Sequence, residues 1–203
     1  MKKALTIIVI VLVCGKAISQ QVITDYENQK KSAIKMEFFS PLTGNTTLGF
    51  ERYLKDWLSW EIKAGIIGLG TDVANSNPGG VFFRGGPKFK LNPDFVTSDT
   101  RGSHLLSGKY IRPEIAFAQY SESLDELDGS SVRTKESYTA LAILITYGRQ
   151  YTLADVMTLD YYFGAGYGYN SNDGGKYNYG FATAGSDFPI AFTAGFTIGF
   201  LLK

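Results

Sequence analysis

Charged side chains recur at every second position in several short stretches of this chain. Lys35 and Glu37 are separated by one apolar residue, and so are Glu61 and Lys63. Both signs occur in similar number, so the charges could neutralise one another as ion pairs. The full candidate set is Lys35, Glu37, Glu51, Glu61, Lys63, Arg84, Lys88, Arg112, Glu114, Arg149 and Asp160. Such a set could form a gated path for protons or ions, or a network of salt bridges that holds the structure together. We expect the network.

The element that must position these charges is a strand with two unlike faces. In the stretch from 190 to 202 every second residue is apolar, while Thr193, Gly195, Thr197 and Gly199 lie between. A period of two is typical of a β-strand. This stretch has no charge before Lys203. Large apolar groups on one face and small ones on the other suit a narrow barrel in lipid.

The same alternation predicts seven further strands. They run over 33–42, 46–55, about 58–66, 81–91, 109–120, about 141–147 and 155–169. Eight is an even count, which single-chain bacterial outer-membrane barrels require. We therefore predict an all-β fold, an eight-stranded antiparallel up-and-down transmembrane β-barrel. Pro87 and Pro113 fall inside predicted strands, where each would remove a ladder hydrogen bond, so they mark either bulges or wrongly placed strands.

Alternation alone does not say which face of the barrel meets lipid. In a soluble lipocalin-like barrel the apolar face points inward. Here the charged face also carries many glycines, and the sixth and eighth strands have almost no charge on either face. Aromatic residues near strand ends fit the girdles at membrane interfaces: Tyr53, Trp57, Trp60, Tyr110, Tyr138, Tyr151 and Tyr169. These features favour charges inside and apolar groups in lipid, with Phe192, Phe196, Ile198 and Phe200 facing outward.

The first residues indicate export. Lys2 and Lys3 precede an apolar run that is too short to span a membrane, and Ala17-Ile18-Ser19 suits cleavage before Gln20. We expect a signal peptide over 1–19, an N-terminal tail over 20–32 and the barrel over 33–203. Cleavage removes the only cysteine, and with it disulfides and thiol chemistry. It also takes the formal net charge from +1 to −2, which gives no reason to expect nucleic acid as a partner.

Enzymatic and metal chemistry have little support in the sequence. His104 is the single histidine, and Ser103, Ser107 and Asp99 near it are ordinary loop residues. Oxygen donors in 170–175 do not match a calcium loop. We predict no catalytic, cofactor or metal site. The outer loops offer a candidate recognition surface, because Tyr177, Tyr179 and Phe181 could bind a ligand or partner. Alternatively, the same loop could fold over the barrel mouth.

The segment Gly49-Phe50-Glu51-Arg52 follows a predicted strand and a short turn. In this layout the chain resembles small outer-membrane barrels, namely the outer-membrane protein A transmembrane domain, outer-membrane protein X and an uncharacterised porin-like family. The resemblance implies an eight-stranded barrel in the outer membrane, surrounded by lipid and lipopolysaccharide.

We therefore expect a monomeric, non-enzymatic barrel with a side-chain-filled lumen and a structural or surface-recognition role. Two alternatives stay open. One is a soluble lipocalin-like carrier of an apolar ligand, and the other is an outer-membrane lipid-modifying enzyme.

Overall fold

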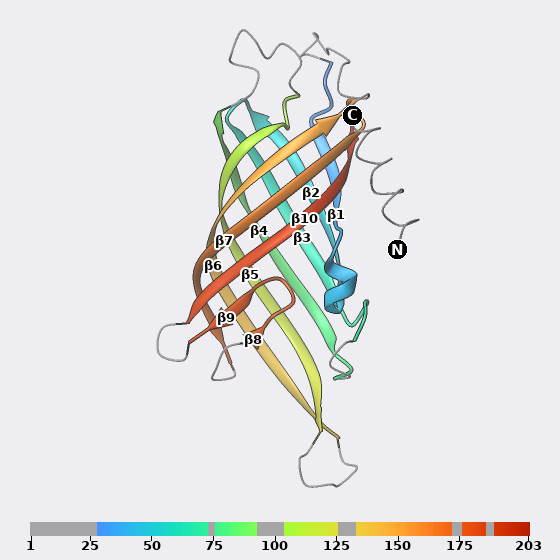
Figure 1. The fold of residues 1–203 in the computed structure, drawn as a ribbon, viewed down its shortest axis with the longest axis vertical. Helices are drawn as coiled ribbons and strands as arrows, with labels where there is room; N and C mark the ends of the chain where they lie inside the picture. Colours follow the sequence, from blue (N-terminus) through green and yellow to red (C-terminus); the bar gives the residue numbers. More distant parts are fainter. Residues whose placement is uncertain (1–27, 73–75, 93–103, 126–132, 172–175, 186–188) are drawn as a thin grey trace, which may run out of the picture.

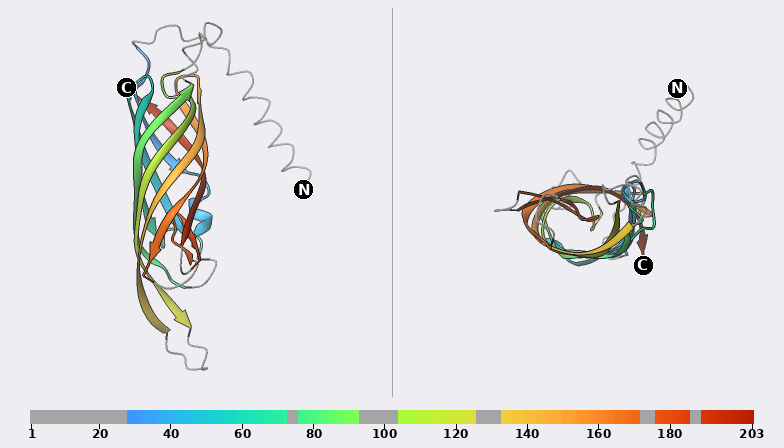
Figure 2. Two further views of the ribbon diagram at one scale, coloured as in Figure 1. Left: turned by 90° about the vertical axis from the view of Figure 1, so that its left-hand side faces the viewer. Right: turned by 90° about the horizontal axis from the view of Figure 1, so that it is seen from below.

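A computed structural model describes residues 28–72, 76–92, 104–125, 133–171, 176–185 and 189–203. Eight of its strands form a closed antiparallel barrel, as the sequence predicts (Figure 1). These strands are β1 (Ser32–Glu37), β2 (Asn45–Lys55), β3 (Leu58–Ile67), β4 (Gly79–Asn92), β5 (Gly108–Asp125), β6 (Arg133–Leu153), β7 (Met157–Asn170) and β10 (Ile190–Leu202). Each pairs with the next, and β10 pairs with β1 to close the ring, which is seen end-on in Figure 2.

Alternation divides each strand into an inner and an outer face. In β3, Ser59, Glu61 and Lys63 are buried, while Trp60 and Ile62 between them are exposed. Large apolar side chains lie on the outer face of all eight strands. They are Ile34, Met36, Leu48, Phe50, Trp60, Ile62, Ile66, Phe83, Phe89, Ile115, Phe117, Leu141, Ile143, Ile145, Tyr161, Phe163, Tyr167, Phe192 and Phe200. The outer face is therefore apolar, and the inner face carries most of the charged side chains of the barrel.

The hairpins differ in length at the two ends of the barrel. At the end where β10 finishes, β6 and β7 are joined by a tight turn in which Val156 N–H donates to Leu153 O at 3.0 Å. At the opposite end β5 and β6 extend well beyond the other strands (Figure 1). The sequence predicts no strand over 121–137, but residues 121–125 belong to β5 and 133–137 to β6, and the two strands pair there from Ser121↔Ser137 to Asp125↔Arg133. The sequence predicts a strand over about 141–147 and a short connection after it, over 149–154, whereas residues 149–153 belong to β6.

Strand β1 is shorter than its sequence suggested. It ends at Glu37, and a 3-10 helix, η2 (Ser40–Thr43), follows with Pro41 in its first turn. Gly44 closes the helix with a φ of 84°, a left-handed conformation that glycine adopts without strain. Two short strands, β8 (Lys176–Tyr177) and β9 (Ala182–Ala184), occupy part of the predicted last loop, and β9 pairs with the start of β10.

The two strand prolines lie directly opposite each other. The pairing of β4 with β5 keeps one register on both sides, from Gly85↔Ile115 to Phe89↔Ile111. That register places Pro87 across from Pro113, and the pairing of β4 with β5 is interrupted between these two flanking pairs. Both prolines still pair in register on their other sides, with β3 and β6. The expected bulges are therefore absent at these two positions, and the strands are correctly placed.

Candidate functional site

The candidate site is the cluster of charged side chains inside the barrel. At its centre two ammonium groups share the same four oxygen atoms. Lys35 Nζ lies 2.7 Å from Glu61 Oε2 and Lys88 Nζ lies 2.9 Å from the same atom. Glu51 Oε2, Asp160 Oδ2 and Gln150 Oε1 also contact both ammonium groups, at 2.5–3.3 Å. Six strands, β1 to β4, β6 and β7, thus contribute to one compact cluster of polar and charged side chains.

A second group of ion pairs lies nearer the outer-loop end. Arg112 contacts Glu61 and, at 3.0 Å, Glu114, so it connects the two groups. Arg84 also pairs with Glu114 at 3.0 Å. Lys63 donates to Glu37 Oε1 at 2.7 Å. All these side chains are at most 1% exposed except that of Glu37, which is 13% exposed.

Two inward tyrosines complete the packing of the cations. The Tyr162 ring lies 4.1 Å from Lys63 Nζ, and Tyr110 lies 4.0 Å from Lys88 Nζ. Cations over aromatic faces gain electrostatic attraction, and more of it when water is excluded. Glycines make the space for these rings, since a Cβ on Gly148 would lie 2.4 Å from the Tyr110 hydroxyl. The girdle predicted for Tyr110 is thus wrong, and Tyr138 is also buried inside.

Ten of the eleven predicted lumen residues lie on the inner face, and Arg149 does not. The alternation of β6 buries Thr146 and Gln150, which places Arg149 in the outward phase beside Tyr147 and Tyr151. Its guanidinium lies 4.7 Å from the Tyr151 ring. The sequence assigned Arg149 to a connection, whereas continuing the strand would have given both its phase and that of Gln150.

An apolar cluster lies inside the barrel at the end where β10 begins. Phe82, Leu144 and Phe181 are each at most 2% exposed and belong to one buried group. The Phe82 ring fits a slot between strands, because a Cβ on Gly65 would lie 1.9 Å from it. Gly180 O accepts a hydrogen bond from Arg84 at 2.8 Å, which ties the β8–β9 loop to the charged cluster.

The three loop aromatics proposed for recognition therefore have different surroundings. Tyr179 and Phe181 are buried, with Tyr179 donating to Glu122 at 2.7 Å. Tyr177 alone stays accessible, at 44% exposed. Burial corrects the expectation that Tyr179 and Phe181 present contact area to a partner. The sequence could not show this, because aromatics between glycines fit a lid as well as a binding loop.

His104 lies in the connection before β5, with both ring nitrogens engaged. The Leu106 N–H donates to Nδ1 at 3.0 Å, so Nε2 carries the proton and donates to Asp155 at 2.8 Å. Burial lowers the pKa of His104 below its ordinary value, against the opposing effect of Asp155. Ser107 bonds instead to Thr152 at 2.6 Å. This geometry gives His104 a structural role at the turn, while the other proposed partners, Asp99 and Ser103, lie outside the described residues.

Two kinds of feature are missing from the part of the chain that the structure describes. No group of three or more histidine, cysteine, aspartate or glutamate side chains there is placed to hold a metal ion. Within the same ranges, no helix combines the length and apolarity needed to cross a membrane. The predicted signal peptide falls at 1–19, which is outside the described residues.

Comparison with known proteins gives a similarity of structure but not of sequence. No family model and no curated protein matches the chain. Among solved structures, the chain is similar to the N-terminal β-barrel domain of OprF from Pseudomonas aeruginosa, with a TM-score of 0.47 and 11% sequence identity. The match covers 86% of this chain and 98% of that domain. A similarity at this level implies nothing about the activity or partners of this chain.

Proposed function

We propose that this chain is an integral outer-membrane β-barrel with a structural role, whose lumen is closed by its own side chains. The observation that carries the proposal is the polarity of the wall, which is charged within and apolar over all eight strands outside. A soluble carrier of an apolar ligand would need the opposite arrangement. A single Lys or Arg facing lipid at mid-membrane costs about 2–4 kcal/mol, which explains why ten of the eleven predicted lumen charges lie on the inner face.

The closed lumen is supported by ion pairing and by size, and a sixth inner cation, Lys90, is buried with its ammonium 5.6 Å from the centre of the Tyr53 ring. Five inner cations, Lys35, Lys63, Arg84, Lys88 and Arg112, contact five inner carboxylates, Glu37, Glu51, Glu61, Glu114 and Asp160. Eight strands leave an interior that side chains can fill. A network paired in this way acts as a plug between the two ends of the barrel.

The outer end would face the cell surface, surrounded by lipopolysaccharide, with both termini of the barrel on the periplasmic side. This orientation follows the usual placing of short turns inside and long hairpins outside. The extended β5–β6 hairpin and exposed Tyr177 would then provide the surface for any contact with an extracellular partner. The protein would act as a monomer and without enzymatic activity.

Gel mobility and conductance test this proposal together. Protein folded in detergent should migrate differently before and after boiling, and should fold only when detergent or lipid is present. In planar bilayers it should give no steady current. Folding in plain buffer with unchanged mobility would contradict the membrane barrel, while a steady single-channel current would contradict the closed lumen.

A further inference from the structure

The barrel wall has a short interruption between β1 and β10. Towards one end β10 pairs with β1 through Thr197, and Phe38 N–H donates to Phe196 O at 2.9 Å. Towards the other end it pairs with β9 through Phe192. Residues 193–195 between these points have no recorded ladder partner on that edge within the described residues, although their opposite edge pairs with β7.

The interruption exposes backbone hydrogen-bonding groups. In an antiparallel ladder, residues two apart direct their N–H and C=O groups to the same side. Because Phe196 O faces β1, the N–H and C=O of Ala194 face the same edge, beyond the end of β1 at Glu37. Unpaired backbone groups at membrane depth are tolerated only where protein or a polar cavity covers them. A hydrogen-bonding partner for the Ala194 N–H and C=O groups is therefore expected at this edge.

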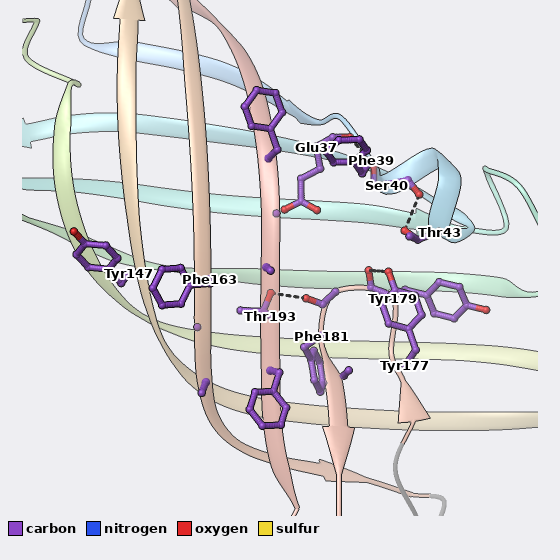
Figure 3. A pocket seen from close by; sticks show the side chains of 18 of the residues that line it. Glu37, Phe39, Ser40, Thr43, Tyr147, Phe163, Tyr177, Tyr179, Phe181 and Thr193 are labelled. Carbon is purple, nitrogen blue, oxygen red and sulfur yellow. Dashed lines mark hydrogen bonds between the residues drawn. The ribbon is translucent and has the colours of Figure 1, made fainter. Parts of the chain in front are cut away.

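A pocket of about 860 Å³ crosses the wall at this place (Figure 3). This volume is within the range of small-molecule sites. Its outer part is a hollow on the apolar face, where the small side chains of Ala165 and Ala194 lie among Ile145, Phe163 and Phe192. The hollow is continuous with the apolar surface that faces lipid in the proposed function. A hydrocarbon chain is the occupant that such a hollow accepts.

The inner end of the pocket has an acceptor available. Glu37 lines it, and the two side chains that donate to this carboxylate within the described ranges, Lys63 Nζ and the Tyr162 hydroxyl, both bond to Oε1. Its side chain is 13% exposed, whereas Glu51, Glu61, Glu114 and Asp160 are at most 1% exposed. Lys63 is only 1% exposed, so Glu37 is the member of this ion pair that an incoming group can reach.

We propose that this opening binds a single-chain amphiphile from the outer leaflet, with its acyl chain in the outer hollow and an uncharged hydroxyl or amide head at Glu37. The head donates to Glu37 Oε2, and the Ala194 N–H and C=O offer it one further donor and acceptor. A carboxylate head is rejected, because it would lie beside Glu37 without an accessible cation. The inference rests on the proposed function, since the outer leaflet supplies the ligand.

Photolabelling in lipid vesicles tests the location of this site. The probe is a monoacylglycerol with a diazirine in its chain, and peptide mass spectrometry maps the labels on the folded full-length barrel. Labels should concentrate on β7 and β10 around Ala165 and Ala194. Ala194→Trp, which fills the hollow, should reduce this labelling at least fivefold. Ile143→Trp is the matched control, because Ile143 is 62% exposed on the same face but does not line the pocket.

The head group is tested with the fatty acid that has the same chain and the same diazirine. At neutral pH the acid should label the site at least fivefold less than the acylglycerol does, and Glu37→Gln should remove this difference. The comparison on the unaltered protein needs no variant, so equal labelling by both probes would overturn the proposed head-group chemistry.

The labelling pattern separates the failure of this site from the failure of the proposed function. Labels that spread over the outer face in proportion to exposure, and that Ala194→Trp does not change, would contradict the proposed binding site. The membrane barrel would still stand if the same protein shows heat-modifiable mobility. Loss of heat-modifiable mobility in the unaltered protein would instead contradict the membrane barrel itself.

Discussion

Glu61 is the carboxylate on which most of the interior cations depend. Its Oε2 contacts Lys35 and Lys88, and its Oε1 contacts Arg112 and, at 3.5 Å, Lys63. Removing one partner of a buried ion pair leaves an uncompensated charge, which typically costs about 3–5 kcal/mol. The side chain is fully buried, so water cannot replace the lost contacts.

Glu61→Gln should therefore lower the free energy of unfolding by about 3–5 kcal/mol, measured by urea titration of the barrel in lipid vesicles. Lys55→Gln is a control at an exposed charge and should change it by about 0.5 kcal/mol or less. Similar small effects at both positions would mean that the inner charges are solvated.

Inner glycines are a second residue-scale determinant, because they make room for aromatic rings. A Cβ on Gly65 would lie 1.9 Å from Phe82, whereas a Cβ on Gly79 would meet nothing within 4 Å. Gly65→Ala should thus destabilise the barrel by about 1–3 kcal/mol in the same titration, as overpacking does. Gly79→Ala should leave it nearly unchanged, and an equal loss at both glycines would contradict the packing of Phe82.

At the scale of elements, the sequence predicted the strands better than their ends. Strand phase follows from alternation, which is why ten of the eleven lumen residues were placed on the correct face. The extension of β6 through Arg149 and the early end of β1 before Pro41 depend on hairpin and turn geometry that alternation does not contain. The folding of Phe181 into the mouth depends on long-range packing against β4 and β6, which a loop sequence does not specify.

The turn between β6 and β7 is an element whose stability should depend on pH. Neutral His104 accepts from Leu106 and donates to Asp155, and protonation of Nδ1 would break the first bond. Its pKa is below 6.5 in the folded protein, mainly because of burial. In the unfolded chain His104 binds its proton more readily than in the folded protein. Neutral His104 therefore contributes to the free energy of unfolding above pH 6.5, and this contribution is lost as the pH falls below that value.

Urea titration of the unaltered protein should therefore give a lower midpoint at pH 5.5 than at pH 7.5, by the reasoning of proton linkage. His104→Gln should remove most of this difference, because glutamine does not titrate. A difference of the same size in the variant would assign the pH dependence to other groups.

At the scale of the whole molecule, one principle connects the inner charges and the outer apolar groups. The backbone hydrogen bonds of a closed barrel are satisfied between strands, so side chains alone decide which face meets which environment. In each of the eight strands, inward and outward side chains alternate. The wall therefore has charged residues such as Lys35 and Glu61 inside and apolar residues such as Ile143 and Phe163 outside. The sequence could predict this polarity, because every strand repeats it.

The most direct test is to place arginine on the outer face. Ile143 is 62% exposed in the middle of β6, and Leu69 is 55% exposed in the connection after β3. Each arginine variant is refolded into lipid vesicles, and its free energy of unfolding is measured together with its heat-modifiable fraction. Ile143→Arg should lose about 2–4 kcal/mol, and Leu69→Arg should stay close to the unaltered protein. Equal stability of the two variants would show that the outer face does not meet lipid.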